Sequence, residues 1–575
     1  MEKKLMLGNE ALARGAWEAG LNLVASYPGT PSTEITENLA KYPEIASQWA
    51  TNEKVAVEVA YGASVAGARA MACMKHVGVN VAADPIFTAA YSGVNGGLVI
   101  VTADDPGMHS SQNEQDSRFY ARSAHIPMLE PADSDECRSF VDIAFKVSER
   151  YDTPVFIRLT TRIAHARSMV ELHERNEVPL KDYVKDIKKY VMMPANAIGR
   201  HVFVEDRENR LKEDCNNCLI NRVEMAGTDV GIITSGASYQ YVKEALPEAS
   251  VLKLGMVYPM PEKMIRDFAS KVKTLYVVEE LEPFFEDQIK AWGIPVSGKD
   301  KTGLQGELSV LKIAKAFGGV VRETPIVPAL DAPIRPPVLC PGCPHRAVFY
   351  MLNKLKLRVA ADIGCYTLGA LAPLSAVDSV LCMGASIGMG TGMSRARGAE
   401  FTRGTVSVIG DSTFLHSGVT GLIDMVYNRS TGTVIILDNR TTGMTGHQEH
   451  AGTGKDIRGN EAHALDFEQL VRACGVEDVQ VVDPFDLAAL QKAIKAATSS
   501  DAPSVIIARR PCALLIKTKT PPVKVEGCKN CGACMKIGCP AIIRGENGVS
   551  IDTSLCTGCG LCKQVCPFGC IKGEE

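Results

Sequence analysis

Apolar segments of strand length alternate with Ala- and Gly-rich segments through residues 1–170. NLVASYPG, GGLVIVTADD and TPVFIRLTT have the length of buried strands, and EKVAVEVAYGASVAGARAMAC has the composition of a helix. This alternation predicts a parallel, doubly wound sheet. Residues 171–226 are more charged and irregular, and they predict a connector.

The same alternation returns twice further along the chain. VGIITSG, SVLKLGMVYP and TLYVVEE predict a second α/β domain over residues 227–325, and Pro-rich sequence at 324–344 indicates its end. A third α/β domain is predicted over 335–515, followed by a compact Cys-rich module over 524–575. The expected fold is therefore three doubly wound α/β domains and a small α+β module, which suits a length of 575 residues.

Composition excludes two kinds of partner. The formal net charge of −4 argues against nucleic acid, because phosphate binding requires a basic surface. The N-terminal residues do not resemble a signal peptide, and the longest apolar runs are far shorter than a bilayer span. We therefore expect a cytoplasmic protein with no membrane contact.

Nine of the nineteen cysteines lie between Cys528 and Cys570, a density that favours metal ligation over disulfides. Three thiolates at i, i+3 and i+6 hold three corners of a cubane, and a distant Cys-Pro supplies the fourth ligand. One [4Fe–4S] cluster is expected on Cys528, Cys531, Cys534 and Cys566. A second is expected on Cys539, Cys556, Cys559 and Cys562.

This module resembles a bacterial two-cluster ferredoxin. It departs from that pattern because four residues rather than three separate Cys534 from Cys539, which predicts a bulged loop. Two structural zinc sites are the alternative interpretation. A third cysteine in each run and the Pro after Cys539 and Cys566 favour iron–sulfur clusters.

Oxygen ligands follow two strands of the third α/β domain. Asp411 is next to last in VSVIGDS, Asn439 ends VIILDN, and the carbonyl of Thr441 lies two residues further on. A divalent cation that holds a diphosphate needs hard oxygen ligands at the carboxyl ends of adjacent parallel strands. We therefore expect Mg²⁺ on these three groups, and two ordinary strand ends are the alternative.

The spacing resembles the GDG…NN signature of thiamine diphosphate enzymes, with Ser412 for the last Gly and Asp438 for the first Asn. The resemblance implies cofactor contacts from Gly410, Asp411, Ser412, Asn439 and Thr441. Upstream, CMGASIGMGTGM is a Gly-rich turn in which Gly384 and Ser386 are expected near the diphosphate. Glycines that pack a helix against a sheet leave the same pattern.

In the first domain, TNEKVAVEVAYGASVAGAR resembles the pyrimidine-binding domain of pyruvate:ferredoxin oxidoreductase. The resemblance implies that Glu53, nine residues before Gly62, faces N1′ of the aminopyrimidine as the catalytic carboxylate. Glu58 is the alternative carboxylate. SYPGTPSTE resembles the family's YPITPS turn, which implies a substrate contact from Thr30.

The order of the domains, together with LCPGCPHR, MKHVGVNVAADP and HSSQNEQDSR, resembles the large subunit of indolepyruvate:ferredoxin oxidoreductases over the whole chain. The resemblance implies that an aryl pyruvate, CoA and oxidised ferredoxin give aryl-acetyl-CoA, CO₂ and reduced ferredoxin. It also implies external ferredoxin and a smaller β subunit, in a heterodimer or an α2β2 heterotetramer. No segment corresponds to the CoA-contacting domain of single-chain relatives.

The substrate and the reaction leave alternatives. Pyruvate-type relatives bind the carboxylate with an Arg near a strand end, but VIVTADDPG has none, so His76, His109 and Arg118 are possible substitutes. Another 2-oxoacid is the alternative substrate. A non-oxidative thiamine diphosphate decarboxylase and an electron carrier with a degenerate α/β body are the alternative classes.

Four further cysteines match the order of ligands in relatives that hold a cluster beside the cofactor. Cys340 and Cys343 form CPGC, Cys365 follows after 21 residues, and Cys512 after a further 146. The resemblance implies a third [4Fe–4S] cluster. Four buried thiols are the alternative, and CNNC at 215–218 is a competing pair.

Overall fold

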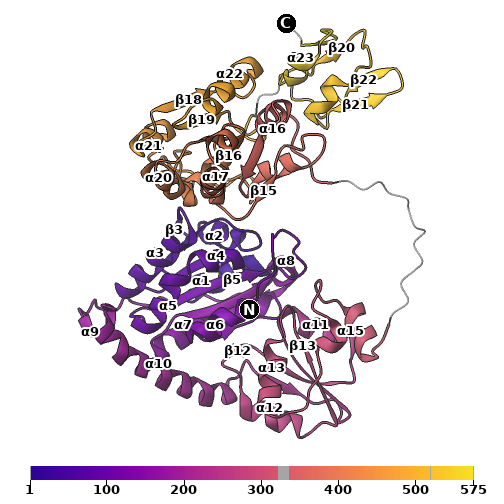
Figure 1. Cartoon of the computed structure of the whole chain (residues 1–575). Helices are drawn as coiled ribbons and strands as arrows, with labels where there is room; N and C mark the ends of the chain where they lie inside the picture. The colour runs from indigo at the N-terminus through magenta and orange to yellow at the C-terminus, as the bar shows by residue number, and fades with distance from the viewer. Residues whose placement is uncertain (1, 322–335, 518–519, 574–575) are drawn as a thin grey trace. The chain divides into compact units, whose positions relative to one another are not determined.

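The computed structural model describes residues 2–321, 336–517 and 520–573, and the chain forms two compact units, 1–328 and 329–575 (Figure 1). The predicted boundary around 324–335 lies outside the described residues. Among the helices of the described residues, none is both long and apolar enough to cross a membrane.

A seven-stranded sheet, in the order β12-β6-β7-β5-β4-β2-β3, forms the core of the first unit. All neighbours are parallel except β12, which is antiparallel to β6. The strands are β2 (Leu23–Ser26), β3 (Ala46–Trp49), β4 (Ala70–Lys75), β5 (Leu98–Asp104), β6 (Met128–Leu129), β7 (Val155–Thr160) and β12 (Met256–Tyr258).

Side chains alternate across this sheet and bury both faces. In β5, Val99 and Val101 pack into one core with α1 (Gly8–Glu18) and α7 (Ser134–Tyr151). Leu98 and Ile100 pack into the other core with α3 (Glu53–Val65), α5 (Ala83–Ser92) and α6 (Arg118–Ala124). Burial on both faces explains why the strands are apolar throughout.

The predicted connector is more regular than its composition indicates. It contains α10 (Pro194–Asp214), a helix of 21 residues, and β9 (Arg222–Glu224). Buried Arg207 of α10 donates hydrogen bonds to the carbonyls of Ala90 and Asp152, which fixes this polar helix to the first domain. Before α10, β8 (Arg167–Glu171) pairs antiparallel with β1 (Lys3–Leu7).

The second α/β domain has a four-stranded sheet in the order β13-β10-β11-β9, parallel apart from β9. Its other strands are β10 (Val230–Ser235), β11 (Ser250–Leu254) and β13 (Thr274–Val278). The segment predicted as one strand, SVLKLGMVYP, divides at Gly255 into β11 and β12, which belong to different sheets. A side chain at Gly255 would lie 2.6 Å from the Ile220 carbonyl oxygen, so the crossing requires glycine.

The second unit contains a six-stranded, wholly parallel sheet in the order β15-β14-β16-β17-β19-β18. The strands are β14 (Arg358–Ala361), β15 (Ser379–Val380), β16 (Thr405–Gly410), β17 (Gly432–Asp438), β18 (Asp478–Val482) and β19 (Pro503–Arg509). Its principal helices are α16 (His345–Lys354), α17 (Ala385–Arg397), α20 (Val419–Tyr427), α21 (Phe467–Ala473) and α22 (Leu487–Thr498). The predicted α/β class with parallel sheets is thus confirmed.

The Cys-rich module is small and packs on this domain. It has two antiparallel pairs, β20 (Lys524–Val525) with β23 (Ile571–Lys572) and β21 (Ile542–Gly545) with β22 (Gly548–Ile551). Two short helices, η4 (Ala533–Ile537) and α23 (Leu561–Val565), follow cysteine loops. The module shares one hydrophobic core with α16 and α22, so its position within the second unit is fixed by packing.

Candidate active site and cluster-binding sites

Three predicted cation ligands converge at the carboxyl edge of the six-stranded sheet. The Asn439 side-chain oxygen faces Asp411 Oδ1 at 3.2 Å and the Thr441 carbonyl oxygen at 3.0 Å. Three facing acceptors repel one another unless the amide turns over or a cation lies between them. Adjacent oxygens of an octahedral Mg²⁺ site lie about 2.9 Å apart, given ligand distances of about 2.1 Å. The geometry therefore fits Mg²⁺.

Buried groups hold Asp411 in place. Its carboxylate accepts hydrogen bonds of 2.8 Å from the amides of Ser412 and Arg440, and His450 Nε2 lies 3.3 Å away. Burial lowers the pKa of nearby His345 to about 4, which keeps this imidazole neutral. Burial, reinforced by the Asp411 charge, raises the pKa of Asp438, whose carboxylate accepts a hydrogen bond from Arg509.

The Gly-rich turn before α17 and the first residues of that helix bind a buried carboxylate of the protein. Buried Asp362 accepts hydrogen bonds from the amides of Ala385 and Ser386 and from the Ser386 hydroxyl, at 2.6–3.3 Å. Gly390 lies so close to Ser407 that a side chain there would meet its hydroxyl at 2.3 Å. Gly390 therefore packs the helix on β16, and a diphosphate contact from Gly384 or Ser386 stays a prediction.

Asp362 is a residue that sequence reasoning missed. It follows β14, so it lies at the same sheet edge as Asp411. Burial raises its pKa to about 6 although Ser386 hydrogen-bonds to the carboxylate. An acid directly after the apolar run RVAA was the available signal.

In the first unit, Glu53 is buried, whereas Glu58, the alternative carboxylate, is exposed. Glu53 begins α3, after Asn52 caps the helix by accepting from the Val55 amide at 2.9 Å. Its side chain lies against Gly78, where an added Cβ would meet Glu53 Oε1 at 2.7 Å. Glu58 is 44% exposed and pairs with Lys54. The burial favours Glu53 over Glu58 as the catalytic carboxylate, and this role stays a prediction.

A buried cation lies beside the turn that contains Thr30. Lys75 ends β4, and its Cβ is 3.1 Å from the position of a Cβ on Gly29. Burial lowers the pKa of Lys75 to about 8, and its Nζ donates to the Ser110 carbonyl at 2.7 Å. Neighbouring His76 is buried with neither ring nitrogen hydrogen-bonded in the described structure. Sequence reasoning missed Lys75 because one lysine after a strand gives no signal.

Arg118 and His109, the two other residues suggested as partners of the substrate carboxylate, pair with acidic side chains of the chain itself. Arg118 is fully buried, donates to both Asp116 oxygens and to Glu279, and stacks on Phe285 at 4.8 Å. With its guanidinium so engaged, Arg118 links the first two α/β domains. Exposed His109 pairs with Glu307 at 3.2 Å.

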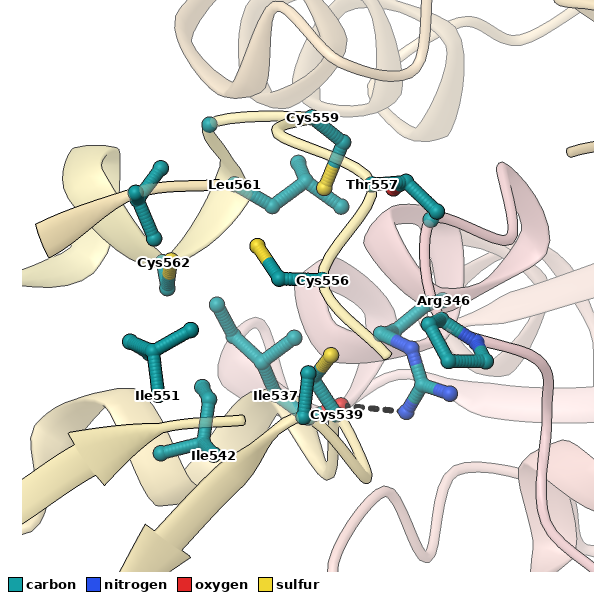
Figure 2. Close-up of a pocket in the computed structure, with 15 residues that line it drawn as sticks. Arg346, Ile537, Cys539, Ile542, Ile551, Cys556, Thr557, Cys559, Leu561 and Cys562 are labelled. Atoms are coloured by element: carbon teal, nitrogen blue, oxygen red, sulfur yellow. Dashed lines mark hydrogen bonds between the residues drawn. The ribbon is translucent and has the colours of Figure 1, made fainter. Parts of the chain in front are cut away.

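The module cysteines form two separate groups that match the two predicted ligand sets. One pocket is lined by Cys539, Cys556, Cys559 and Cys562, as Figure 2 shows, and another by Cys528, Cys531, Cys534 and Cys566. Burial and then the thiols of its own set raise the pKa of Cys562 to about 12, and the Cys534 pKa is raised in the same way. Cys570, the ninth, donates to the Gly527 carbonyl at 3.1 Å.

The four cysteines outside the module also lie together. Burial raises the pKa of Cys365 to about 11, and Cys512 and Cys340 raise it further. Burial likewise raises the pKa of Cys343 to about 12, with Cys340 and Cys512 again nearby. Thiols whose charges raise one another's pKa lie near one another, and an iron core shared by these four cysteines stays a prediction. The competing Cys215 packs in the core of the first unit.

None of these groups forms a closed shell for a single ion. In the described ranges, no three His, Cys, Asp or Glu side chains converge on one such position. The cluster assignments therefore rest on the shared pockets and on the mutual effects of the thiols, and they stay predictions.

Known families match the chain in the same order as these sites. A model of the pyruvate flavodoxin/ferredoxin oxidoreductase thiamine-diphosphate-binding domain matches residues 14–212. A thiamine pyrophosphate enzyme C-terminal domain model matches 362–508, and a 4Fe-4S binding domain model matches 549–572.

Relatives extend over almost the whole chain. Indolepyruvate oxidoreductase subunit IorA of Archaeoglobus fulgidus is 42% identical over 99% of this chain and 97% of its own. The same subunit of Pyrococcus horikoshii is 41% identical over 99% and 97%. A 2-oxoglutarate:ferredoxin oxidoreductase structure from Magnetococcus marinus has 20% identity and a TM-score of 0.46 over 54% of this chain and 64% of its own.

The fold, the sites and these matches define a thiamine-diphosphate-dependent oxidoreductase of the class that acts on 2-oxoacids with an iron–sulfur acceptor. Within that class, the chain belongs to the indolepyruvate oxidoreductase subunit IorA family.

Proposed function

We propose that the chain oxidatively decarboxylates aryl pyruvates, indolepyruvate among them, with CoA, and passes the electrons to ferredoxin. This proposal rests on the 42% identity, over 99% of the chain, to a subunit named indolepyruvate oxidoreductase. The same chemistry on another 2-oxoacid is the alternative, because a 2-oxoglutarate synthase subunit KorA from Archaeoglobus fulgidus is 26% identical over 48% of the chain.

We assign the pyrimidine ring to residues 1–170 and the diphosphate to 335–515. The connector covers 171–226, a domain that resembles the transketolase C-terminal domain covers 227–325, and the two-cluster ferredoxin module covers 524–575. Asp411, Asn439 and the Thr441 carbonyl would hold Mg²⁺, in support of which their oxygens lie 3.0–3.2 Å apart. Glu53 would hold a proton shared with N1′ of the aminopyrimidine. When bound, thiamine diphosphate supplies the carbanion that adds to the keto group and stabilises the charge left by CO₂.

Lys75 would bind the carboxylate of the 2-oxoacid. It lies beside the Thr30 turn, and a desolvated ammonium group attracts a carboxylate more strongly than an exposed one. Its hydrogen-bond partners, the carbonyl and hydroxyl of Ser110, are neutral, and a substrate carboxylate would add to the attraction that nearby Asp105 exerts on its charge.

Three [4Fe–4S] clusters would carry the electrons outward. Pro341 and Gly342 of the CPGC turn line the pocket of Cys539, Cys556, Cys559 and Cys562, whereas the other module pocket contains only module residues. The first of these is therefore the inner cluster and the second the outer one. External ferredoxin would be reduced at the outer cluster, and a smaller subunit, in a heterodimer or an α2β2 heterotetramer, would complete the CoA site.

An anaerobic assay of the complex with CoA and a viologen dye tests the substrate. Indolepyruvate and phenylpyruvate should give kcat/KM values at least about tenfold above those of pyruvate and 2-oxoglutarate, a difference of about 1.4 kcal/mol. A preference for 2-oxoglutarate would establish the alternative substrate. Decarboxylation without dye reduction would contradict the oxidative reaction.

A further inference from the structure

Arg346 joins two loops that contain predicted cluster ligands. It is the second residue of α16, directly after the CPGC turn, and only 2% of it is exposed. Its Nη2 donates to the carbonyls of Leu339 and Cys340. Its Nη1 donates to the carbonyl of Ile537, as Figure 2 shows, and to that of Gly538. The first pair belongs to the CPGC turn and the second to the loop before Cys539.

The loop that Arg346 binds is the one that departs from the ferredoxin spacing. Gly538, the residue before Cys539, has φ +69°, and a Cβ there would lie 2.8 Å from Pro373 Cδ and 3.4 Å from Arg346 Nη1. In this loop, which has one residue more than the ferredoxin spacing, the successive carbonyls of Ile537 and Gly538 both point toward the Arg346 guanidinium group. A planar fork of donors suits this task, whereas a lysine ammonium would not span both loops.

A second contact joins the CPGC turn to another loop of the module. Gly342 of the CPGC turn has φ +71°, and a Cβ there would meet Thr557 Oγ1 of the Cys556–Cys559 loop at 2.3 Å. On another side, Gln564 accepts from the Leu487 amide at 3.1 Å and donates to the Phe485 carbonyl at 2.6 Å. The module is therefore held at several points, and losing the guanidinium alone should not release it.

Among the described residues, Arg346 donates its side-chain hydrogen bonds to backbone carbonyls and to no carboxylate. All four acceptors are neutral carbonyls, and in the part of the chain described here Nε is buried without a hydrogen bond. A buried cation without a counterion is costly. The cysteines whose charges act on it come from both neighbouring ligand sets, and they are Cys539, Cys343, Cys559 and Cys340. Thiolate-ligated clusters on both sides would supply the missing negative charge.

We propose that Arg346 is a positioning residue shared by two clusters. It holds the inner module cluster against the cluster on the CPGC turn, and its charge stabilises the reduced form of both. In the transfer step, one electron leaves the CPGC cluster, which is oxidised, and enters the inner cluster, which is reduced. No bond changes and no proton moves. The electron originates in the oxidation of the 2-oxoacid, so the inference rests on the proposed function.

The test is an anaerobic redox titration of the full-length complex, followed by EPR, with dithionite as reductant and no 2-oxoacid. Arg346→Gln should keep its iron. The reduction equilibrium of the inner cluster should shift at least about tenfold toward the oxidised form, which is 59 mV for one electron. The spin–spin interaction between reduced clusters should also weaken. Exposed Arg544, in β21 of the same module, provides the control Arg544→Gln, which should leave both readouts unchanged.

Wild-type potential and spin coupling in Arg346→Gln with full iron would overturn the proposal. If that variant does not hold its clusters, Arg346→Lys decides. It keeps the charge, so we expect a near-wild-type potential with weakened coupling, and unchanged coupling would refute the positioning role. Iron analysis of the wild type reports the proposed cluster number separately, because three cubanes contain about twelve irons and two contain about eight.

Discussion

The amide of Cys512 donates a hydrogen bond of 2.9 Å to the backbone carbonyl of Asn439. Cys512 follows β19 and Asn439 follows β17, and these strands are parallel neighbours. A predicted cluster ligand and a predicted Mg²⁺ ligand are therefore linked by one backbone hydrogen bond. This short connection explains how an electron would leave the cofactor site without crossing a domain boundary.

Loss of the cation site should remove the cofactor without affecting the clusters. In Asp411→Ala, the Asn439 and Thr441 oxygens lose the only charged member of their set, so the purified complex should retain less than about a tenth of the wild-type thiamine diphosphate. Iron content should not change. Asp424→Ala, an exposed change on α20, is the control and should keep both. Normal cofactor occupancy in Asp411→Ala would refute the assignment.

Replacing the buried carboxylate should impair proton transfer alone. Glu53→Gln keeps the size of the side chain that packs against Gly78, so the cofactor should bind. Exchange of the C2 proton, followed by NMR after acid quench in D₂O, should slow by at least about a hundredfold. Glu58→Gln should exchange at the wild-type rate because Glu58 is exposed. The reverse order of the two variants would reassign the acid.

If Lys75 binds the substrate carboxylate, its loss should raise KM for the 2-oxoacid, and kcat/KM should depend on its protonation. Lys75→Met should raise KM for the 2-oxoacid by about ten- to a hundredfold, the range of a charge-assisted hydrogen bond of about 1.5–3 kcal/mol. Burial lowers the pKa of Lys75 to about 8, so the cation is present below pH 8 and is lost as the pH rises through that value. The wild-type kcat/KM should therefore fall above pH 8.

Exposed Lys41 provides the matched control for this experiment. Lys41→Met should keep the wild-type KM. If Lys75→Met leaves both KM and the alkaline limb unchanged, the carboxylate is bound elsewhere.

The third cluster is best tested in the full-length chain. The module shares a hydrophobic core with α16 and α22, so truncation before Lys524 would expose apolar surface and obscure the result. Cys365→Ser should lose about four of twelve irons and keep the EPR signals of the module clusters. Cys474→Ser, outside every predicted ligand set, should lose none. Unchanged iron in Cys365→Ser would contradict the third cluster.

Local patterns predicted several of the strands and the spacing of the cysteines, although residues 70–73, expected at the end of a helix, belong to β4. Apolar runs buried on both sheet faces and thiols spaced along tight loops leave their signal in consecutive residues. Contacts between distant residues leave none. Asp362 accepts a hydrogen bond from Ser386, which lies 24 residues further along the chain. Gly255, between β11 and β12, packs against Ile220. Arg346 donates a hydrogen bond to the carbonyl of Gly538 in the Cys-rich module. These contacts arise only once the chain has folded.

The most direct test of electron flow from the cofactor to the clusters is a single turnover without ferredoxin or dye. Indolepyruvate and CoA are mixed anaerobically with the oxidised complex, while cluster absorbance and EPR are recorded. We predict bleaching and a reduced-cluster signal in the wild type, and neither in Asp411→Ala. Release of CO₂ by the wild type with the clusters still oxidised would contradict the account.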